Sequence, residues 1–210
     1  MRNAVYMDGI AIDVLLIGFL ERNPDGSVIC EKTSSSSVLI RCPGHNIVVD
    51  TGSPFMAAGI KTSFKQIGIF RDDVDILVLT HSHADHTGNV KLFPKAKIIM
   101  HAGDEPYPGA QIVDGPEYQI TKGVKLVHTP GHTPGSSSVF VSADREYVIA
   151  GDACPLADNL LHMIPPRLNC DEDAALESLR MIASAADVVI PGHGGPFFTQ
   201  KGTRKKKSRK

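Results

Sequence analysis

Six consecutive residues contain three imidazoles and one carboxylate, in the order His81, Ser82, His83, Ala84, Asp85, His86. Such side chains are costly to bury without partners, and His and Asp are weak formers of helix interiors. Neutral imidazole and carboxylate together suit a borderline divalent metal such as zinc. The apolar run 74–80 before the cluster predicts a buried strand, and residues 87–89 break that pattern. The cluster is therefore expected on a loop at a strand end, where scaffolded sites are common.

Four further segments repeat the pattern of an apolar strand that ends in a polar residue flanked by glycine. They end at Asp50, His132, Asp152 and His193. Each segment alone is weak evidence, since a His or Asp after a strand is more often a turn former or a satisfied polar group. Five such pieces in this order indicate a metal site built from several strand ends.

With these motifs, the chain resembles the metallo-β-lactamase fold superfamily over about residues 10–198, and its ligand spacings are similar to those of the glyoxalase II branch. The resemblance implies an α/β (α+β) fold, arranged as a four-layer αββα sandwich. It also implies two adjacent metals, expected to be two Zn²⁺ per chain, with Fe or Mn as alternatives. The implied ligands are His81, His83 and His132 for the first metal, Asp85, His86 and His193 for the second, and Asp152 as the bridge, with Asp50 behind them as an orienting residue.

The resemblance implies a metal-dependent hydrolase. Two cations about 3.5–4 Å apart can share a bridging water and depress its pKa toward neutrality, which yields a hydroxide nucleophile without any Ser or Cys. We expect it to attack a thioester, lactone or similar ester, with Asp85 as the proton shuttle and Asp50 supporting catalysis. The alternatives are a phosphodiesterase or nuclease acting on RNA or DNA, a mononuclear iron persulfide dioxygenase, and a metal-holding binding module without turnover.

The segments around the last two ligands, Asp152 and His193, indicate which members of the superfamily the chain resembles most. Only residues 194–210 follow His193, so the helical extension of glyoxalase II is expected to be missing. The short format and the ending 191–197 are most similar to the small metallo-β-lactamase-domain-containing proteins. Residues 154–158 differ from the Gly-Arg-x-Asp stretch that usually follows the bridging Asp in persulfide dioxygenases, which disfavours that alternative.

Two loops are expected to wall the substrate pocket. One begins at His101 and includes Tyr107, and the other contains His162. These three residues are the candidate substrate contacts, because loops carry specificity on such scaffolds. Cys154 lies two residues past Asp152, where we expect it to pack near the metals without binding them.

Composition fits one domain over residues 1–200, because a chain of 210 residues with 42% hydrophobic and 21% charged residues can bury a large core. The segment 201–210 holds seven of the 22 basic residues and no acid, so a disordered basic tail is expected. Its favoured role is solubility, and its alternative is attraction of RNA, DNA or an acidic partner. No run approaches the roughly 18–20 apolar residues of a membrane span. Four widely spaced cysteines predict free thiols and a cytoplasmic enzyme.

The expected partner is a small ester-type molecule, and the sequence does not specify an oligomeric state.

Strands are predicted over 11–20, 28–32, 37–42, 47–50, 75–80, 97–101, 124–127, 137–141, 146–150 and 188–190. Helices are predicted over 53–68, with Ser53 as the N-cap, and over 171–186, with acids in the first turn.

Overall fold

Apolar residues alternate along the strands of the first sheet and bury both of its faces. In β4 (Ser37–Cys42), Val38 and Ile40 enter the core between the two sheets, whereas Leu39 faces the helices. The side chains of the neighbouring strand β5 (His45–Val49) alternate in the same way, with Ile47 and Val49 in the core between the sheets and Val48 facing the helices. Because side chains alternate with a period of two, each strand contributes to two packed layers.

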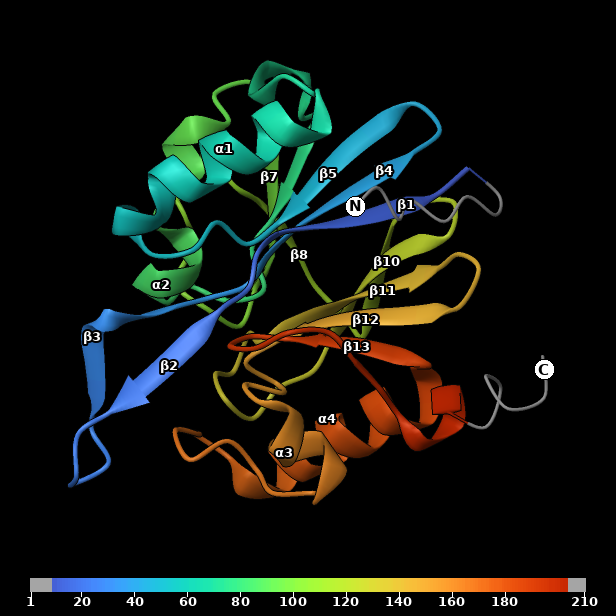
Figure 1. Cartoon of the computed structure of the whole chain (residues 1–210). Helices are drawn as coiled ribbons and strands as arrows, with labels where there is room; N and C mark the ends of the chain where they lie inside the picture. Colours follow the sequence, from blue (N-terminus) through green and yellow to red (C-terminus); the bar gives the residue numbers. More distant parts are fainter. Residues whose placement is uncertain (1–8, 204–210) are drawn as a thin grey trace.

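Two six-stranded sheets pack face to face, and helices cover their outer faces (Figure 1). The first sheet has the order β1-β4-β5-β6-β7-β8, in which β1–β4 and β4–β5 are antiparallel and the rest parallel. Its other strands are β1 (Ala11–Leu16), β6 (Ile76–Val78), β7 (Lys97–His101) and β8 (Gln111–Val113). The computed structural model describes residues 9–203. The four-layer αββα sandwich expected from the sequence is confirmed.

The second sheet has the order β14-β13-β12-β11-β10-β9, with only β12 and β13 parallel. Its strands are β9 (Glu117–Thr121), β10 (Val124–His128), β11 (Ser137–Ser142), β12 (Glu146–Gly151), β13 (Val188–Pro191) and β14 (Phe197–Phe198). Residues such as Leu126, Val139 and Ile149 meet the first sheet in the shared core. The two sheets therefore share one hydrophobic interior.

Helix α1 (Ala57–Ile67) covers the first sheet, and α4 (Glu172–Ala185) covers the second, with α3 (Ala157–Leu161) beside α4. Asp171 caps α4, because its carboxylate accepts a hydrogen bond from the amide of Ala174 at 2.9 Å. Ser53 is the N-cap residue of the helical turn Pro54–Met56, as expected, but its side chain makes no capping hydrogen bond. Its hydroxyl donates to the Thr33 carbonyl at 2.6 Å, which ties the start of this turn to residue 33. Shorter helical turns are η1 (Pro54–Met56), η2 (Arg71–Asp73), α2 (Ala84–Thr87) and η3 (Val90–Leu92).

The single strand expected over 11–20 is divided into two. β1 ends at Leu16, and a separate hairpin follows, formed by β2 (Phe19–Arg22) and β3 (Val28–Ser34). A Cβ at Gly18 would lie 2.4 Å from the Gly192 carbonyl oxygen and 2.5 Å from the Ser36 nitrogen. The close approach of these backbones requires glycine, and beyond it the hairpin projects from the sandwich (Figure 1).

The folded part of the chain continues into the segment expected to be a tail. Residues 200–203 form a helical turn in which the amide of Thr203 donates to Thr199 at 3.0 Å. Lys201 Nζ donates to the Ala185 carbonyl at 2.6 Å, and Gly202 is buried. The folded domain therefore extends past residue 200, where the tail was expected to begin. The hydrogen bond from Lys201 gives a partner to the carbonyl of Ala185, the last residue of α4. The remaining tail residues, 204–210, lie outside the described residues.

Within residues 9–203, every helix is too short or too polar to cross a membrane. The four cysteines are free thiols, as expected. Cys154 is fully buried among apolar residues beneath α3 and α4, and burial raises the pKa of its thiol to about 12.

Candidate metal centre

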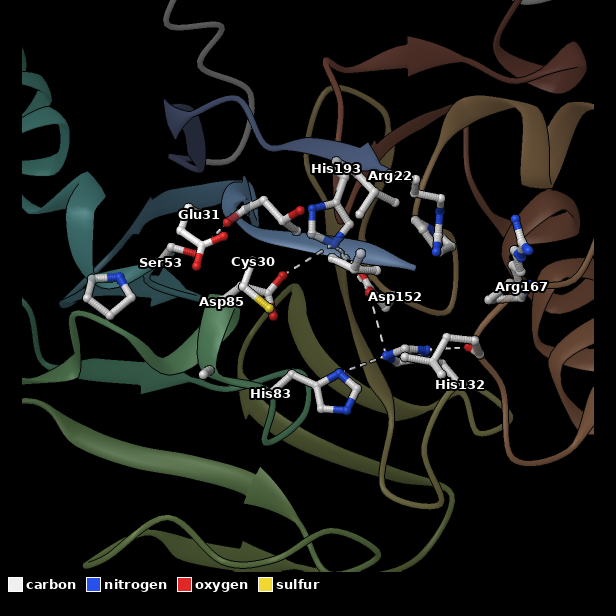
Figure 2. Close-up of a pocket in the computed structure, with 18 of the residues that line it drawn as sticks. Arg22, Cys30, Glu31, Ser53, His83, Asp85, His132, Asp152, Arg167 and His193 are labelled. Atoms are coloured by element: carbon white, nitrogen blue, oxygen red, sulfur yellow. Dashed lines mark hydrogen bonds and ion pairs between the residues drawn. The ribbon is translucent and has the colours of Figure 1, made fainter. Parts of the chain in front are cut away.

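The ends of four strands bring the histidines and aspartates to one edge of the sandwich. The loop after β6 carries His81 and His83, and the short helix α2 carries Asp85 and His86. The loops after β10, β12 and β13 supply the remaining side chains, which are His132, Asp152 and His193. Figure 2 shows the labelled members of this set pointing toward one another. Segments far apart in sequence thus form one cluster.

The first group that can hold a metal consists of His81, His83 and His132. His83 Nδ1 lies 3.1 Å from His81 Nε2 and 3.1 Å from His132 Nε2. Ligands about 2.0–2.1 Å from a tetrahedral zinc lie roughly 3.3–3.4 Å from one another, so this spacing fits the ion closely. His132 Nδ1 lies 2.6 Å from the Leu168 carbonyl, which directs its N–H there and leaves Nε2 to bind a cation.

The second group consists of Asp85, His86 and His193, and Asp152 adjoins both groups. His193 Nε2 lies 3.6 Å from an oxygen of Asp85 and 3.3 Å from Asp152 Oδ1. The other Asp152 oxygen, Oδ2, lies 3.5 Å from His132 Nε2 of the first group. His193 Nδ1 lies 2.9 Å from the Ser34 carbonyl, which fixes its ring as Leu168 fixes that of His132.

Two buried polar atoms face the middle of the cluster without a hydrogen-bond partner among residues 9–203. They are His86 Nε2 and Asp152 Oδ1, which lie 3.4 Å apart. Leaving such atoms unsatisfied costs roughly 1–3 kcal/mol each. A divalent cation bound between them would satisfy both, so the residues present fit the metal that the cluster predicts.

Burial and neighbouring charges shift the pKa values of several residues of the cluster in opposite directions. Burial lowers the pKa of His81 and His83, and neighbouring imidazoles add to the effect, so both rings are neutral. Burial opposes charge on His86 too, but Asp50 and Asp152 outweigh it and raise its pKa well above the ordinary value. Burial would likewise raise the pKa of Asp152, yet His193 and His86 hold it well below its usual range. Burial also opposes charge on His193, but Asp152 outweighs it and raises that pKa too. Only neutral imidazoles and ionised carboxylates bind metals, so a cation would take the place of the proton on His86 and on His193.

Asp50 lies behind His86 and outside the cavity described below. Its carboxylate accepts hydrogen bonds from the Thr80 amide at 2.9 Å and the Thr80 hydroxyl at 2.7 Å, and it lies 2.7 Å from His86 Nδ1. The residue has a φ of 54°, in the left-handed region that costs energy for most side chains but favours Asp and Asn. This backbone turn directs the carboxylate back toward the ligand loop.

A cavity of about 560 Å³ opens above the cluster. His83, Asp85, His132, Asp152 and His193 line its base. Its walls are mainly apolar and are formed by Leu20, Val28, Pro54, Phe55, Pro155, Pro166 and Leu168. The projecting hairpin β2–β3 supplies one wall and the loop between α3 and α4 the other. An apolar chamber over a polar base is typical of a small-molecule site.

The three predicted substrate contacts lie away from this cavity. His101 is buried and stacks on His128 with ring centroids 3.9 Å apart, and its Nε2 lies 3.2 Å from the Gly115 carbonyl. Tyr107 packs against the core under α1, and His162 is exposed at the end of α3. We therefore do not retain them as substrate contacts. The loop that contains His162 lines the cavity through Pro155, Pro166 and Leu168, but His162 itself does not. The stretch that begins at His101 contributes no lining residue.

Asp104 has a role that the sequence analysis missed. One oxygen, Oδ2, accepts hydrogen bonds from the Ser82 amide at 3.0 Å and the Thr133 hydroxyl at 3.1 Å. The other, Oδ1, accepts one from the Gly135 amide at 2.9 Å. A single carboxylate therefore joins the loop that carries His81 and His83 to the loop that carries His132. A Cβ at Gly135 would lie 2.4 Å from the Asp104 nitrogen, and one at Gly103 would lie 2.6 Å from the Pro134 carbonyl oxygen, so both glycines permit this close approach of the two loops.

Replacing Asp104 by alanine is expected to weaken zinc binding by roughly 10–100-fold, the usual effect of losing a residue that orients ligands. The reason is that the first group of histidines would no longer be held at its present spacing. Competition with a chromophoric chelator measures the affinity. Asp114→Ala is the matched control, since this exposed aspartate accepts only from the adjacent Gly115 amide among the described residues. Equal zinc affinity in the Asp104 variant and the control would contradict this role.

Comparisons with known proteins agree with the fold and with a metal-dependent hydrolase. A family model of the metallo-beta-lactamase superfamily matches residues 31–118 and 103–193. A probable metallo-hydrolase of Methanocaldococcus jannaschii is 37% identical over 155 residues, which cover 74% of each chain. Metallo-beta-lactamase domain-containing protein 1 of Mus musculus is 31% identical over 212 residues, covering 97% of this chain and 80% of the relative.

Among solved structures, a quorum-quenching N-acyl homoserine lactone hydrolase matches with a TM-score of 0.73 and 21% identity, over 90% of this chain and 94% of that chain. The sandwich and the His/Asp cluster at its edge define a metal-dependent hydrolase. The family match shows, further, that the chain belongs to the metallo-β-lactamase superfamily. The likeness to the mouse protein agrees with the expected similarity to small members of the superfamily, whereas placement in the glyoxalase II branch stays a prediction.

Proposed function

We propose that the chain is a dinuclear zinc hydrolase that acts on thioesters, lactones or similar esters. The observation that carries the proposal is the position of Asp152 between two groups of possible ligands. One carboxylate oxygen lies 3.3 Å from His193 and 3.4 Å from His86, and the other lies 3.5 Å from His132. A carboxylate that faces both groups suits a pair of ions better than one.

In this proposal, His81, His83 and His132 would hold one ion, Asp85, His86 and His193 would hold the other, and Asp152 would serve both groups. Bound divalent ions supply a nucleophilic water at neutral pH and a Lewis acid for the carbonyl oxygen. Imidazole is an uncharged ligand, so three of them would leave the first ion its full positive charge, which favours that chemistry.

The chain's own residues supply the proton transfer and the substrate environment. Asp85 projects from α2 into the cavity, and its carboxylate is a quarter exposed, so it can exchange protons with both the substrate and water. Ser53 also lines the cavity, but its hydroxyl donates to the Thr33 carbonyl and is not directed at an imidazole base. The site therefore favours an activated water over a serine nucleophile.

The substrate class follows from the cavity. Its apolar walls suit the organic part of an ester and exclude water from the reacting carbonyl, which strengthens electrostatic interactions there. The lactone hydrolase named above shows only the fold at 21% identity, but its substrate is one of the esters proposed here.

The decisive experiment combines metal analysis with a substrate panel. Purified, zinc-loaded protein is expected to hold close to two zinc ions per chain and to hydrolyse a thioester or lactone faster than bis-p-nitrophenyl phosphate. Elemental analysis and initial rates measure the two quantities. One iron per chain with oxygen-dependent turnover of a persulfide would support the dioxygenase instead, and cleavage confined to phosphodiesters would support the nuclease.

A further inference from the structure

Two arginines from distant parts of the chain lie on one side of the cavity. Arg22 ends β2, and Arg167 belongs to the loop between α3 and α4. Arg22 Nη1 donates to the Gly26 carbonyl at 2.9 Å, and Arg167 Nη2 donates to the Asp25 carbonyl at 3.2 Å. A Cβ at Gly26 would lie about 2 Å from the Arg167 guanidinium, so both guanidinium groups adjoin the same turn. Figure 2 shows them on the same side of the pocket.

Neither guanidinium forms an ion pair with a carboxylate in residues 9–203. Each uses one of its five N–H donors on a backbone carbonyl, which leaves the others for a ligand. Glu21, next to Arg22 in sequence, pairs with Lys32 instead. Asp25 lies at the same turn, where its carboxylate accepts from the Ser27 amide at 2.8 Å and the Ser27 hydroxyl at 2.7 Å. These two hydrogen bonds are the main cause of its lowered pKa, and the charge of Arg167 adds to the effect. Glu31 lies across the pocket from the arginines in Figure 2.

We propose that Arg22 and Arg167 form an anion subsite that binds a carboxylate or phosphate on the non-reacting part of the substrate. The planar guanidinium recognises such groups through paired hydrogen bonds, and two of them beside apolar walls would select for an anionic end. The inference rests on the proposed function and deepens it. The preferred ester then has its carbonyl at the metal cluster, an apolar body along Leu20, Val28 and Leu168, and a negative charge at the cavity rim.

A series of matched thioesters tests the subsite. The compounds share one acyl thioester core and end in a neutral amide, a carboxylate or a phosphate, so the last two distinguish the sources of the anion. Arg22→Gln and Arg167→Gln are each expected to lower kcat/KM for the anionic esters about 10-fold, mainly by raising KM, and to leave the neutral ester unchanged. Arg22→Lys should recover part of the loss, because it keeps the charge but not the planar fork.

Arg180→Gln is the matched control, since Arg180 is exposed on α4 and does not line the cavity. Equal losses on neutral and anionic esters would show that the arginines only hold the hairpin turn, and the subsite would be wrong. If the wild-type chain hydrolyses none of the esters, the proposed function fails. Calorimetric binding of a non-hydrolysable ether analogue with the same anionic end would then still test the subsite, which requires weaker binding in both Gln variants than in the control.

Discussion

Replacing Asp152 by alanine is expected to release at least one of two metals and to lower turnover by more than about 100-fold, because losing a ligand costs more than losing an orienting residue. The Asp152 carboxylate faces both ligand groups, at 3.3 Å from His193 and 3.5 Å from His132. Its negative charge would also offset part of the positive charge of the bound ions. Elemental analysis of purified protein and initial rates on the best ester measure both effects.

Asp152→Asn distinguishes the loss of the negative charge at residue 152 from the loss of the side chain's volume in Asp152→Ala. Asparagine is nearly isosteric and fits against Gly192, whose backbone leaves little room, because a Cβ there would lie 2.0 Å from Asp152 Oδ1. It cannot supply two anionic oxygens, so it should also lose metal and turnover. Circular dichroism confirms that each variant is folded. Two zinc ions and full activity in the alanine variant would remove the dinuclear mechanism.

Asp50→Asn is expected to preserve the fold and most of the bound metal while lowering activity by roughly 10–100-fold. Asparagine tolerates the φ of 54° at this position, so the variant changes the charge without adding backbone strain. Only one amide oxygen remains to accept the two hydrogen bonds of Thr80 and the contact with His86 Nδ1 at 2.7 Å. His86 would then be held less firmly, and the cluster would lose the charge behind it.

His193→Ala provides the comparison for Asp50. His193 Nε2 faces Asp85 and Asp152 inside the cluster, so His193→Ala should remove a metal. Asp50→Asn should not remove one. Zinc content and kcat/KM are measured on both variants in parallel. Loss of a metal from Asp50→Asn, with two retained in His193→Ala, would show that Asp50 is a ligand and His193 is not.

Most of the fold could be predicted because local patterns and tertiary packing agree. Helix α4 has a capping aspartate, acids in its first turn and buried residues at helical spacing, so its observed bounds differ from the predicted ones by one residue at each end. The short elements were missed because they lack such patterns. Helix α2 consists only of Ala84–Thr87, and its sequence is dominated by the polar residues of the site. The division after β1 was missed because Gly18 is required by a backbone more than 150 residues away.

The sequence by itself determined which residues are candidates for the metal chemistry. Strand ends that deliver His and Asp indicate metal chemistry, since few other functions require so many imidazoles at apolar strand ends. Only the tertiary structure decided what surrounds them. Asp104 joins two ligand loops, and Arg22 and Arg167 contact the same turn. The expected substrate contacts His101, Tyr107 and His162 lie outside the cavity. The physical reason is that the side chains of a strand alternate with a period of two, so a few neighbouring residues are enough to predict a strand and the residue at its end. Contacts between loops depend instead on which distant parts of the backbone the two packed sheets bring together.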